Sequence, residues 1–298
     1  MPFARAASAA VLFAAALQGC AAPEDTDTPV VEKTFPETVG GQRPADVIRP
    51  ADFTEDETLP VIILLHGYAA TSYLEDVIFH LQDRVDTSRF LLVMPEGNVD
   101  AGGFQFWNAS EECCNFSGSK VNDVKYLSGL ADEMRAEFNV STVAFVGHSN
   151  GGYMGYRLAC DAPESFDRLM VLAGSGPVVE PDCDASQIPL LHVHATADDT
   201  ITYDANEGAG GLVPTVGAVE TVRRYAAHAG CDATTTAVGT ADLTTLQEGE
   251  EASGVAYASC PAPVALWTIE GGDHYYLNAT DTLRDGVVAF ALGGDPTF

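Results

Sequence analysis

The sequence predicts an α/β protein in which one doubly wound, mostly parallel sheet carries helices on both faces. Apolar runs of strand length alternate along the chain with segments of helical spacing, which is typical of strand–helix–strand units. Residues 60–66 (PVIILLH) are aliphatic at odd and even positions alike, as a strand buried on both faces requires. Residues 145–160 (FVGHSNGGYMGYRLAC) have the pattern of a strand that leads directly into a helix through a glycine-rich turn.

The elements follow one another in an order that supports this fold. Antiparallel edge strands are expected within residues 34–59. Short apolar runs predict the further strands at 60–66, 90–95, 142–146, 169–173, 189–194 and 264–269. Apolar residues at helical spacing predict helices at 73–85, 122–138, 151–160, 217–228 and 280–292. Residues 232–259, rich in Thr, Gly and acidic residues and without a clear period, predict an irregular insertion.

Composition limits the possible partners. The chain has 298 residues, 46% of them hydrophobic, which is enough for one large domain over residues 35–298. It carries 43 Asp and Glu against 14 Lys and Arg, a net charge of −29. Such a charge repels phosphate backbones and anionic lipid surfaces, so nucleic acid is excluded as an expected partner. We expect a monomer with no metal or organic cofactor.

The N-terminus predicts export. Residues 6–17 form an apolar run too short to span a membrane as a mature helix. The run ends in LQGC, which resembles the bacterial lipobox whose cysteine, here Cys20, is lipidated; Gln18 departs from the usual small residue. We therefore expect a lipoprotein signal peptide at 1–20 and a flexible acidic tether at 21–34. The protein is then a membrane-anchored lipoprotein, periplasmic or at the cell surface, attached only through its lipid. The alternative is an ordinary secretory signal.

Six further cysteines lie in the expected domain, and an even number in an exported chain predicts disulfides. Cys231 and Cys260 are expected to pair, since they would close the irregular segment between a helix and a strand. The remaining four cysteines are expected to pair among themselves, and their pairing stays open: Cys113 and Cys114 are adjacent, and either could reach Cys160 or Cys183. The absence of a C-x-x-C pair makes zinc binding a weak alternative.

Ser149 is the candidate nucleophile. Gly147-His148-Ser149-Asn150-Gly151 fits the pattern G-x-S-x-G, and it stands between a predicted strand and a predicted helix, as that motif requires. Glycines on both sides permit a turn tight enough to expose the serine above the sheet. The alternative is a structural serine in a glycine-rich bend.

A nucleophilic serine needs a base, an acid that orients the base, and donors for the oxyanion. Two later strands end in loops that carry Asp198 and Asp199, and then His274, in the chain order serine, acid, base. The backbone N–H of Asn150 is one expected oxyanion donor. The N–H of Tyr68, which follows the His-Gly turn after strand 60–66, is the other.

Aromatic residues near these loops are candidates for the substrate pocket. Phe104, Phe106 and Trp107 lie in GGFQFWN, and Tyr275 and Tyr276 follow the candidate base. Aromatic packing in the core or in a lid is an equally good interpretation of each.

Together these motifs resemble the secreted bacterial polyhydroxybutyrate depolymerase and feruloyl esterase group of α/β-hydrolases, over about residues 40–295. The resemblance rests on LLHG, CCNFSGSKVNDVKYL, GHSNGGYMGYRLAC, HVHATADDTITY and IEGGDH. It implies Ser149 as nucleophile, His274 as base and Asp198, rather than Asp199, as acid. Ala195 stands where the group has glycine, and Tyr275-Tyr276-Leu277 replaces a run often containing Trp-Pro-Gly.

The resemblance implies a serine esterase that hydrolyses feruloyl or aryl esters, or a polyester such as polyhydroxybutyrate, through an acyl-enzyme. Two alternatives remain open. One is a serine peptidase of related fold, because GHSNGGY also resembles the corresponding turn of oligopeptidases. The other is a tethered binding protein on a catalytically dead scaffold.

Overall fold

The computed structural model describes residues 34–180, 187–208 and 213–298, and Phe35–Phe298 form one compact unit. Its main sheet contains the strands β1 (Thr38–Val39), β2 (Ala45–Ile48), β3 (Leu59–Leu65), β4 (Leu91–Met94), β7 (Val140–His148), β8 (Arg168–Leu172), β9 (Leu190–Ala195), β10 (Thr235–Ala241), β11 (Ala252–Tyr257) and β12 (Val264–Ile269). A separate two-stranded ribbon consists of β5 (Asn98–Val99) and β6 (Gln105–Phe106). The helices are α1 (Ser72–Phe79), α2 (Val85–Ser88), α3 (Asp123–Glu137), α4 (Asn150–Asp161), α5 (Ala218–His228) and α6 (Asp281–Ala291).

The sheet is parallel at its centre and antiparallel at both edges. Its strand order is β1-β2-β4-β3-β7-β8-β9-β12-β11-β10. The pairs from β4 to β12 are parallel, whereas β1, β2, β10 and β11 pair antiparallel. The carboxyl ends of β3, β7, β9 and β12 therefore lie at one edge, where α/β sheets place their chemistry.

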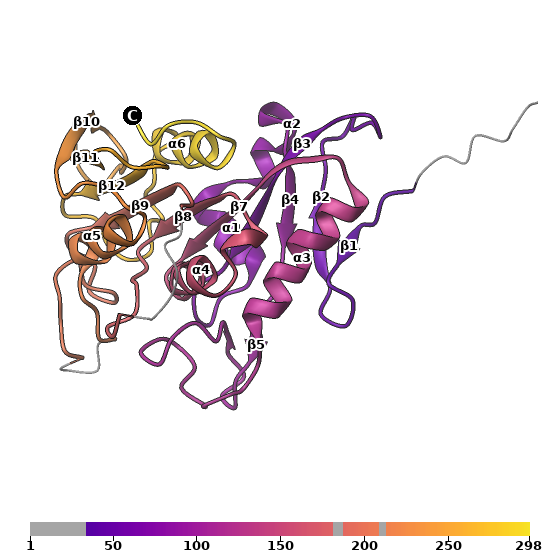
Figure 1. Cartoon of the computed structure of the whole chain (residues 1–298), viewed down its shortest axis with the longest axis horizontal. Helices are drawn as coiled ribbons and strands as arrows, with labels where there is room; N and C mark the ends of the chain where they lie inside the picture. Colours follow the sequence, from indigo (N-terminus) through magenta and orange to yellow (C-terminus); the bar gives the residue numbers. More distant parts are fainter. Residues whose placement is uncertain (1–33, 181–186, 209–212) are drawn as a thin grey trace, which may run out of the picture. The chain divides into compact units, whose positions relative to one another are not determined.

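Helices cover both faces of this sheet (Figure 1). The core on one face contains residues of α3, α4 and α5, and the core on the other contains residues of α1 and α6. Strand β3 contributes to both, since Ile63 and Leu65 belong to the first core and Ile62 and Leu64 to the second. This alternation explains why the strand is aliphatic at every position, and it confirms the doubly wound prediction.

The helix expected at 73–85 is interrupted. Helix α1 ends at Phe79, and His80 adopts a left-handed conformation with φ 51°. The Asp76 carboxylate accepts hydrogen bonds from the Leu81 N–H at 2.6 Å and the Gln82 N–H at 3.3 Å. A 3₁₀ turn, Gln82–Arg84, and the short α2 follow. The apolar period continues through the break, so periodicity alone does not detect it.

The expectation of an irregular insertion at 232–259 is wrong. This segment forms the hairpin β10–β11. Strand β11 also pairs with β12, with Ala252 opposite Ile269 at one end and Ala256 opposite Ala265 at the other. Most of β10 is exposed, so it shows no alternation of apolar and polar residues. Backbone hydrogen bonding to the existing sheet orders the segment, and little apolar burial is needed.

The cysteines pair in part as the sequence predicts. Cys231 and Cys260 form a disulfide with their Cα atoms 4.1 Å apart, and Cys160 is disulfide-bonded as well. Cys113 and Cys114 are joined to each other, so neither of them reaches Cys160 or Cys183, which the sequence had left open. The turn that carries them is closed by hydrogen bonds between Ser110 and Cys113, and both cysteines are buried there.

Cys183, the expected signal peptide with Cys20, and nearly all of the expected tether lie outside the described residues. Across the described ranges, none of the helices combines the length and the apolar character needed to cross a membrane.

Candidate active site

Ser149 lies on a strained turn between β7 and α4. Its backbone has φ 53° and ψ −120°, a combination that residues other than glycine rarely adopt. The Ser149 N–H donates to the Leu172 carbonyl at 2.9 Å, which ties the turn to the neighbouring strand. A Cβ at Gly147 would collide with the Gly151 carbonyl, and one at Gly151 would collide with the Leu65 carbonyl. Both glycines of the motif are therefore required by close backbone approach.

The structure brings Ser149, His274 and Asp198 together. The Ser149 Oγ lies 3.0 Å from the His274 Nε2, and the His274 Nδ1 lies 2.7 Å from the Asp198 Oδ2. Because a carboxylate only accepts, Nδ1 carries a proton and Nε2 is left to accept one from the serine hydroxyl. All three residues are at least 93% buried, with exposed fractions of 7%, 4% and 4%.

Asp198 is held by its own loop, and Asp199 is not part of the constellation. The Asp198 Oδ1 accepts hydrogen bonds from the backbone N–H groups of Thr200 at 2.9 Å and Ile201 at 2.8 Å. Burial alone raises the pKa of Asp198, but hydrogen bonds from His194 and His274 outweigh it and hold that pKa well below the usual value. Asp199 is exposed, and its carboxylate accepts from the Thr200 hydroxyl at 3.3 Å.

A buried chain of side chains supports the acid from behind. The His194 Nε2 faces the Ile201 carbonyl at 2.7 Å, so this nitrogen carries a proton, and it lies 3.4 Å from the Asp198 Oδ2. The His194 Nδ1 then accepts from the His192 Nε2 at 3.1 Å, and the His192 Nδ1 accepts from the Tyr156 hydroxyl at 2.7 Å. Burial lowers the pKa of His192 well below its ordinary value, which keeps His192 neutral.

The pKa of His274 is lowered from its ordinary value. Burial is the largest cause, because it disfavours the imidazolium, and the hydrogen bond to Asp198 opposes it. The nearby His148 also lowers the His274 pKa. His274 is therefore neutral, and able to accept a proton, at neutral pH.

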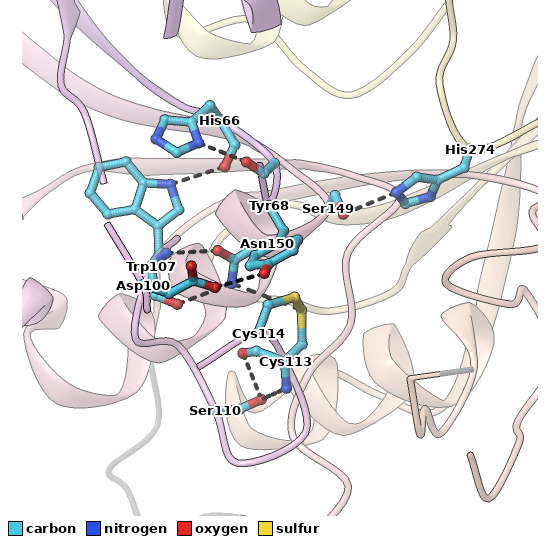
Figure 2. Close-up of a disulfide and its surroundings, with 11 residues drawn as sticks. His66, Tyr68, Asp100, Trp107, Ser110, Cys113, Cys114, Ser149, Asn150 and His274 are labelled. Atoms are coloured by element: carbon cyan, nitrogen blue, oxygen red, sulfur yellow. Dashed lines mark hydrogen bonds between the residues drawn. A yellow bond between two sulfur atoms is a disulfide. The ribbon is translucent and has the colours of Figure 1, made fainter. Parts of the chain in front are cut away.

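Asn150 and Tyr68 lie on the two backbone segments that border Ser149. The Asn150 side chain is fully buried: its Oδ1 accepts from the Trp107 N–H at 2.7 Å and its Nδ2 donates to the Trp107 carbonyl at 3.1 Å. The same Nδ2 lies 3.9 Å from the Cys113 Sγ, so Asn150 is held between Trp107 and the disulfide (Figure 2). The Trp107 indole in turn donates to the His66 carbonyl at 2.9 Å, next to the Gly67-Tyr68 turn.

A cavity of about 600 Å³ opens beside Ser149 and His274. One part of its lining is apolar side chains from the α1 region and the loop of the base, namely Leu74, Val77, Ile78, Tyr275 and Leu277. Another part comes from the segments at Tyr68, Cys114, Phe116, Ile201 and Val213. The Phe116 ring is 65% exposed and lies edge-on to the Tyr68 ring at 5.3 Å.

Of the five aromatic candidates for the pocket, Tyr275 is the one among its lining residues. Phe106 and Trp107 are fully buried in the protein, and Tyr276 is 6% exposed, so these three predictions are wrong. Phe104 is half-exposed and packs against the Tyr68 ring at 5.9 Å, outside the lining. An aromatic residue in a short motif can face either side of its strand or turn, and the motif does not say which.

Two features of the site escape prediction from the sequence. Glu75 and His148 both border the cavity, and Glu75 lies on a helix whose sequence, SYLEDVIF, gives no sign of a buried acid. The disulfide between adjacent cysteines borders it through Cys114. Across residues 34–180, 187–208 and 213–298, no group of three or more His, Cys, Asp or Glu side chains is arranged to hold a metal ion.

Comparisons with known proteins identify the family. The family model described as "Putative esterase" matches residues 37–206, more than half of the chain. "Putative esterase NocK" from Nocardia uniformis subsp. tsuyamanensis is 25% identical over 254 residues, 78% of this chain and 70% of that protein. "Probable feruloyl esterase C" from Aspergillus niger is 25% identical over 162 residues, 53% of this chain and 52% of that protein.

"Bifunctional acetylxylan esterase/xylanase XynS20E" from Neocallimastix patriciarum is 27% identical over 172 residues, 57% of this chain. The chain spans 23% of the length of that fungal protein.

Solved structures confirm the fold. An acetyl xylan esterase from Aspergillus awamori superimposes with a TM-score of 0.54 at 12% identity, covering 81% of this chain and 92% of that one. The esterase PE8 gives a TM-score of 0.52 at 17% identity, covering 83% and 96%. The chain has the α/β-hydrolase fold.

Proposed function

The chain belongs to the esterase family described as "Putative esterase", and we propose that it hydrolyses carboxylic esters through an acyl-enzyme on Ser149. The observation that carries the proposal is the connected set Ser149–His274–Asp198 at 3.0 and 2.7 Å, which opens into an apolar cavity. A scaffold that only binds has no need to keep a serine strained on such a turn beside a neutral base.

In the proposed acylation step, the His274 Nε2 takes the proton of the Ser149 hydroxyl as its Oγ attacks the ester carbonyl. Asp198 keeps the proton of His274 on Nδ1 and stabilises the imidazolium that forms. The backbone N–H groups of Asn150 and Tyr68 are the proposed donors to the oxyanion. Asn150 is the first residue of α4, where the N–H groups have no partner within the helix and favour negative charge.

The tetrahedral intermediate then collapses. The C–O bond to the alcohol breaks, and the His274 imidazolium gives its proton to the departing oxygen. A water molecule loses a proton to the same nitrogen and attacks the acyl group. The second intermediate releases the acid and returns the proton to Ser149.

The cavity favours an ester with an apolar acyl or alcohol part. The polar groups that line it belong mainly to the site itself, while most of the remaining lining is aliphatic or aromatic. The exposed Phe116 ring, the Tyr68 ring and the Cys114 sulfur together suit a planar aromatic group. We therefore propose a feruloyl or other aryl ester, with a hydrophobic polyester such as polyhydroxybutyrate as the alternative substrate.

We further propose that the protein is exported and tethered through a lipid at Cys20, with residues 35–298 as one catalytic domain. The short apolar run and LQGC support this proposal.

A panel of substrates tests the proposed function. Purified protein is assayed on methyl ferulate, p-nitrophenyl acetate, acetylated xylan, polyhydroxybutyrate and a matched p-nitroanilide, with Ser149→Ala as control. The proposal expects hydrolysis of one or more esters by the wild type and none by the variant. Activity that survives in Ser149→Ala contradicts it, and faster cleavage of the anilide indicates a peptidase.

A further inference from the structure

We propose that Glu75 and His148 form a buried positioning pair, which ties the loop of the base to the loop of an oxyanion donor and places a positive charge beside the base. Neither residue belongs to the proposed Ser149–His274–Asp198 set. The inference rests on the proposed function, because it assigns these two residues a part in the same hydrolysis.

The pair connects three segments that are distant in sequence. The Glu75 Oε2, on α1, accepts a hydrogen bond from the Gly67 N–H at 2.7 Å, one residue before Tyr68. The Glu75 Oε1 lies 2.9 Å from the Nδ1 of His148, the residue before the nucleophile. The His148 Nε2 lies 2.8 Å from the backbone carbonyl of His274. A single side-chain pair thus touches the oxyanion segment, the nucleophile turn and the loop of the base.

The partners of His148 fix where its protons are. A carbonyl oxygen only accepts, so the His148 Nε2 carries a proton and donates it to His274. The His148 Nδ1 faces a carboxylate oxygen at 2.9 Å, and a bare nitrogen lone pair there would repel it. A proton therefore belongs at the Nδ1–Oε1 contact. Because the pKa of Glu75 is lowered and that of His148 is raised, we assign this proton to the imidazole, which makes the pair an imidazolium beside a carboxylate.

Burial makes this pair costly to break. Glu75 is 2% and His148 5% exposed. Burial raises the Glu75 pKa, but His148, the Gly67 N–H and His66 together lower the net pKa. Burial lowers the His148 pKa, but Glu75, the His274 carbonyl and Asp198 together raise the net pKa. Removing one partner would leave the other charge uncompensated in a dry site. The other titratable groups that face the pair are Asp198, His66, His274 and Tyr276.

The positive charge lies close to the base. The rings of His148 and His274 are 4.9 Å apart, and His148 lowers the pKa of His274. The Glu75 carboxylate contacts the Nδ1 of His148, whereas the Nε2 contacts the loop of the base, and His148, not Glu75, is among the groups that shift the His274 pKa. The pair therefore acts on the base as a dipole whose positive end is nearer, which favours the neutral, proton-accepting form of His274.

Glu75→Gln separates this role from simple packing. The glutamine has the same shape and can still accept from the Gly67 N–H and donate to the His148 Nδ1, but it leaves His148 neutral. We expect the acid limb of the kcat/KM profile for p-nitrophenyl acetate to move to higher pH by roughly a few tenths of a unit in a water-like dielectric. Loss of the imidazolium charge alone would give about half a unit, and loss of the carboxylate charge offsets part of it. The rate on the alkaline plateau should fall less than about tenfold, because the hydrogen bonds are remade.

Asp76→Asn is the matched control. Asp76 is the next residue of α1, is 7% exposed, and accepts hydrogen bonds from backbone N–H groups that lie away from the site. Its substitution should lower stability and leave the acid limb in place. An unmoved limb in Glu75→Gln, or an equal shift in both variants, overturns the inference. A wild-type chain that hydrolyses no ester overturns the proposed function and this inference with it.

A measurement on the wild type protects the test against a variant that does not fold. The imidazole ¹⁵N shifts of His148, assigned by their loss in His148→Gln, should show both ring nitrogens protonated at pH 7. A neutral His148 ring at that pH overturns the inference while leaving the esterase proposal intact.

Discussion

Asp198→Asn tests the acid in detail. In the native site the Asp198 Oδ1 is occupied by the N–H groups of Thr200 and Ile201, and the Oδ2 faces the His274 Nδ1 at 2.7 Å. An asparagine whose oxygen keeps the two backbone bonds must turn its NH₂ group toward His274. Two donors cannot share that position, so His274 changes tautomer and presents an N–H, instead of a lone pair, to Ser149.

The size of the loss follows from this change. In a serine hydrolase, the wrong tautomer lowers kcat by about 10⁴-fold, or about 5.5 kcal/mol of transition-state stabilisation. The fold should survive, since the asparagine keeps the hydrogen bonds of the loop. Asp199→Asn is the matched control: Asp199 is exposed and interacts with the Thr200 hydroxyl, so its substitution should change kcat less than about twofold.

The assay is kcat/KM on p-nitrophenyl acetate, with circular dichroism to confirm folding of each variant. Asp198→Asn with more than a tenth of wild-type activity, or a larger loss in Asp199→Asn, would refute the assignment of the acid and the tautomer argument.

Three further predictions concern the base and two of the disulfides. The wild-type kcat/KM should fall with decreasing pH through the pKa of His274, because the neutral base is the active form. The midpoint should lie below the ordinary histidine value of about 6.5, because burial lowers the pKa of His274. A pH titration that places the midpoint above that value contradicts this prediction. Joint replacement of Cys231 and Cys260 by serine should lower the free energy of unfolding by about 3–4 kcal/mol in the chain-entropy model, measured by urea denaturation; no loss would mean that the hairpin already restrains the ends. Replacing Cys113 and Cys114 by serine should raise KM for aryl esters severalfold, because Cys114 borders the cavity, and lower kcat only slightly, because the Trp107 backbone still holds Asn150; a large drop in kcat would show that the disulfide is needed to hold that donor.

The candidate nucleophile and the candidate base can be selected from the sequence because their signals are local. G-x-S-x-G between a strand and a helix defines the turn at Ser149, and His274 follows the last apolar strand. The parallel sheet brings the ends of those strands to one edge, so chain order is enough to associate the residues. The choice between Asp198 and Asp199 needed the family resemblance, since adjacent acids have the same local pattern.

Glu75 is missed because its role arises from tertiary contacts. In SYLEDVIF the charged residues are typical of a solvated helix face. The partners of the buried Glu75 are Gly67, in the turn after β3, and His148, at the end of β7. The hairpin β10–β11 is missed because backbone pairing with β12 orders it, and such pairing leaves no apolar period in the sequence.

The substrate pocket is the least predictable part. The motif GGFQFWN supplies three aromatic residues, yet Trp107 is in the core and holds Asn150 through its backbone. Leu74, Phe116 and Leu277, which do border the cavity, come from three separate segments that the fold brings together. Whether a residue borders the pocket depends on the direction in which its side chain points, and a short motif does not determine that direction.

Peptide mapping after covalent labelling tests the central claim most directly. Wild-type protein and Ser149→Ala are treated with a fluorophosphonate, digested and analysed by mass spectrometry. The account predicts one phosphonylated peptide, with the label on Ser149, in the wild type, loss of esterase activity in proportion to labelling, and no adduct in the variant. An unlabelled wild type that still hydrolyses esters, or a label on any other residue that abolishes activity, would contradict the account.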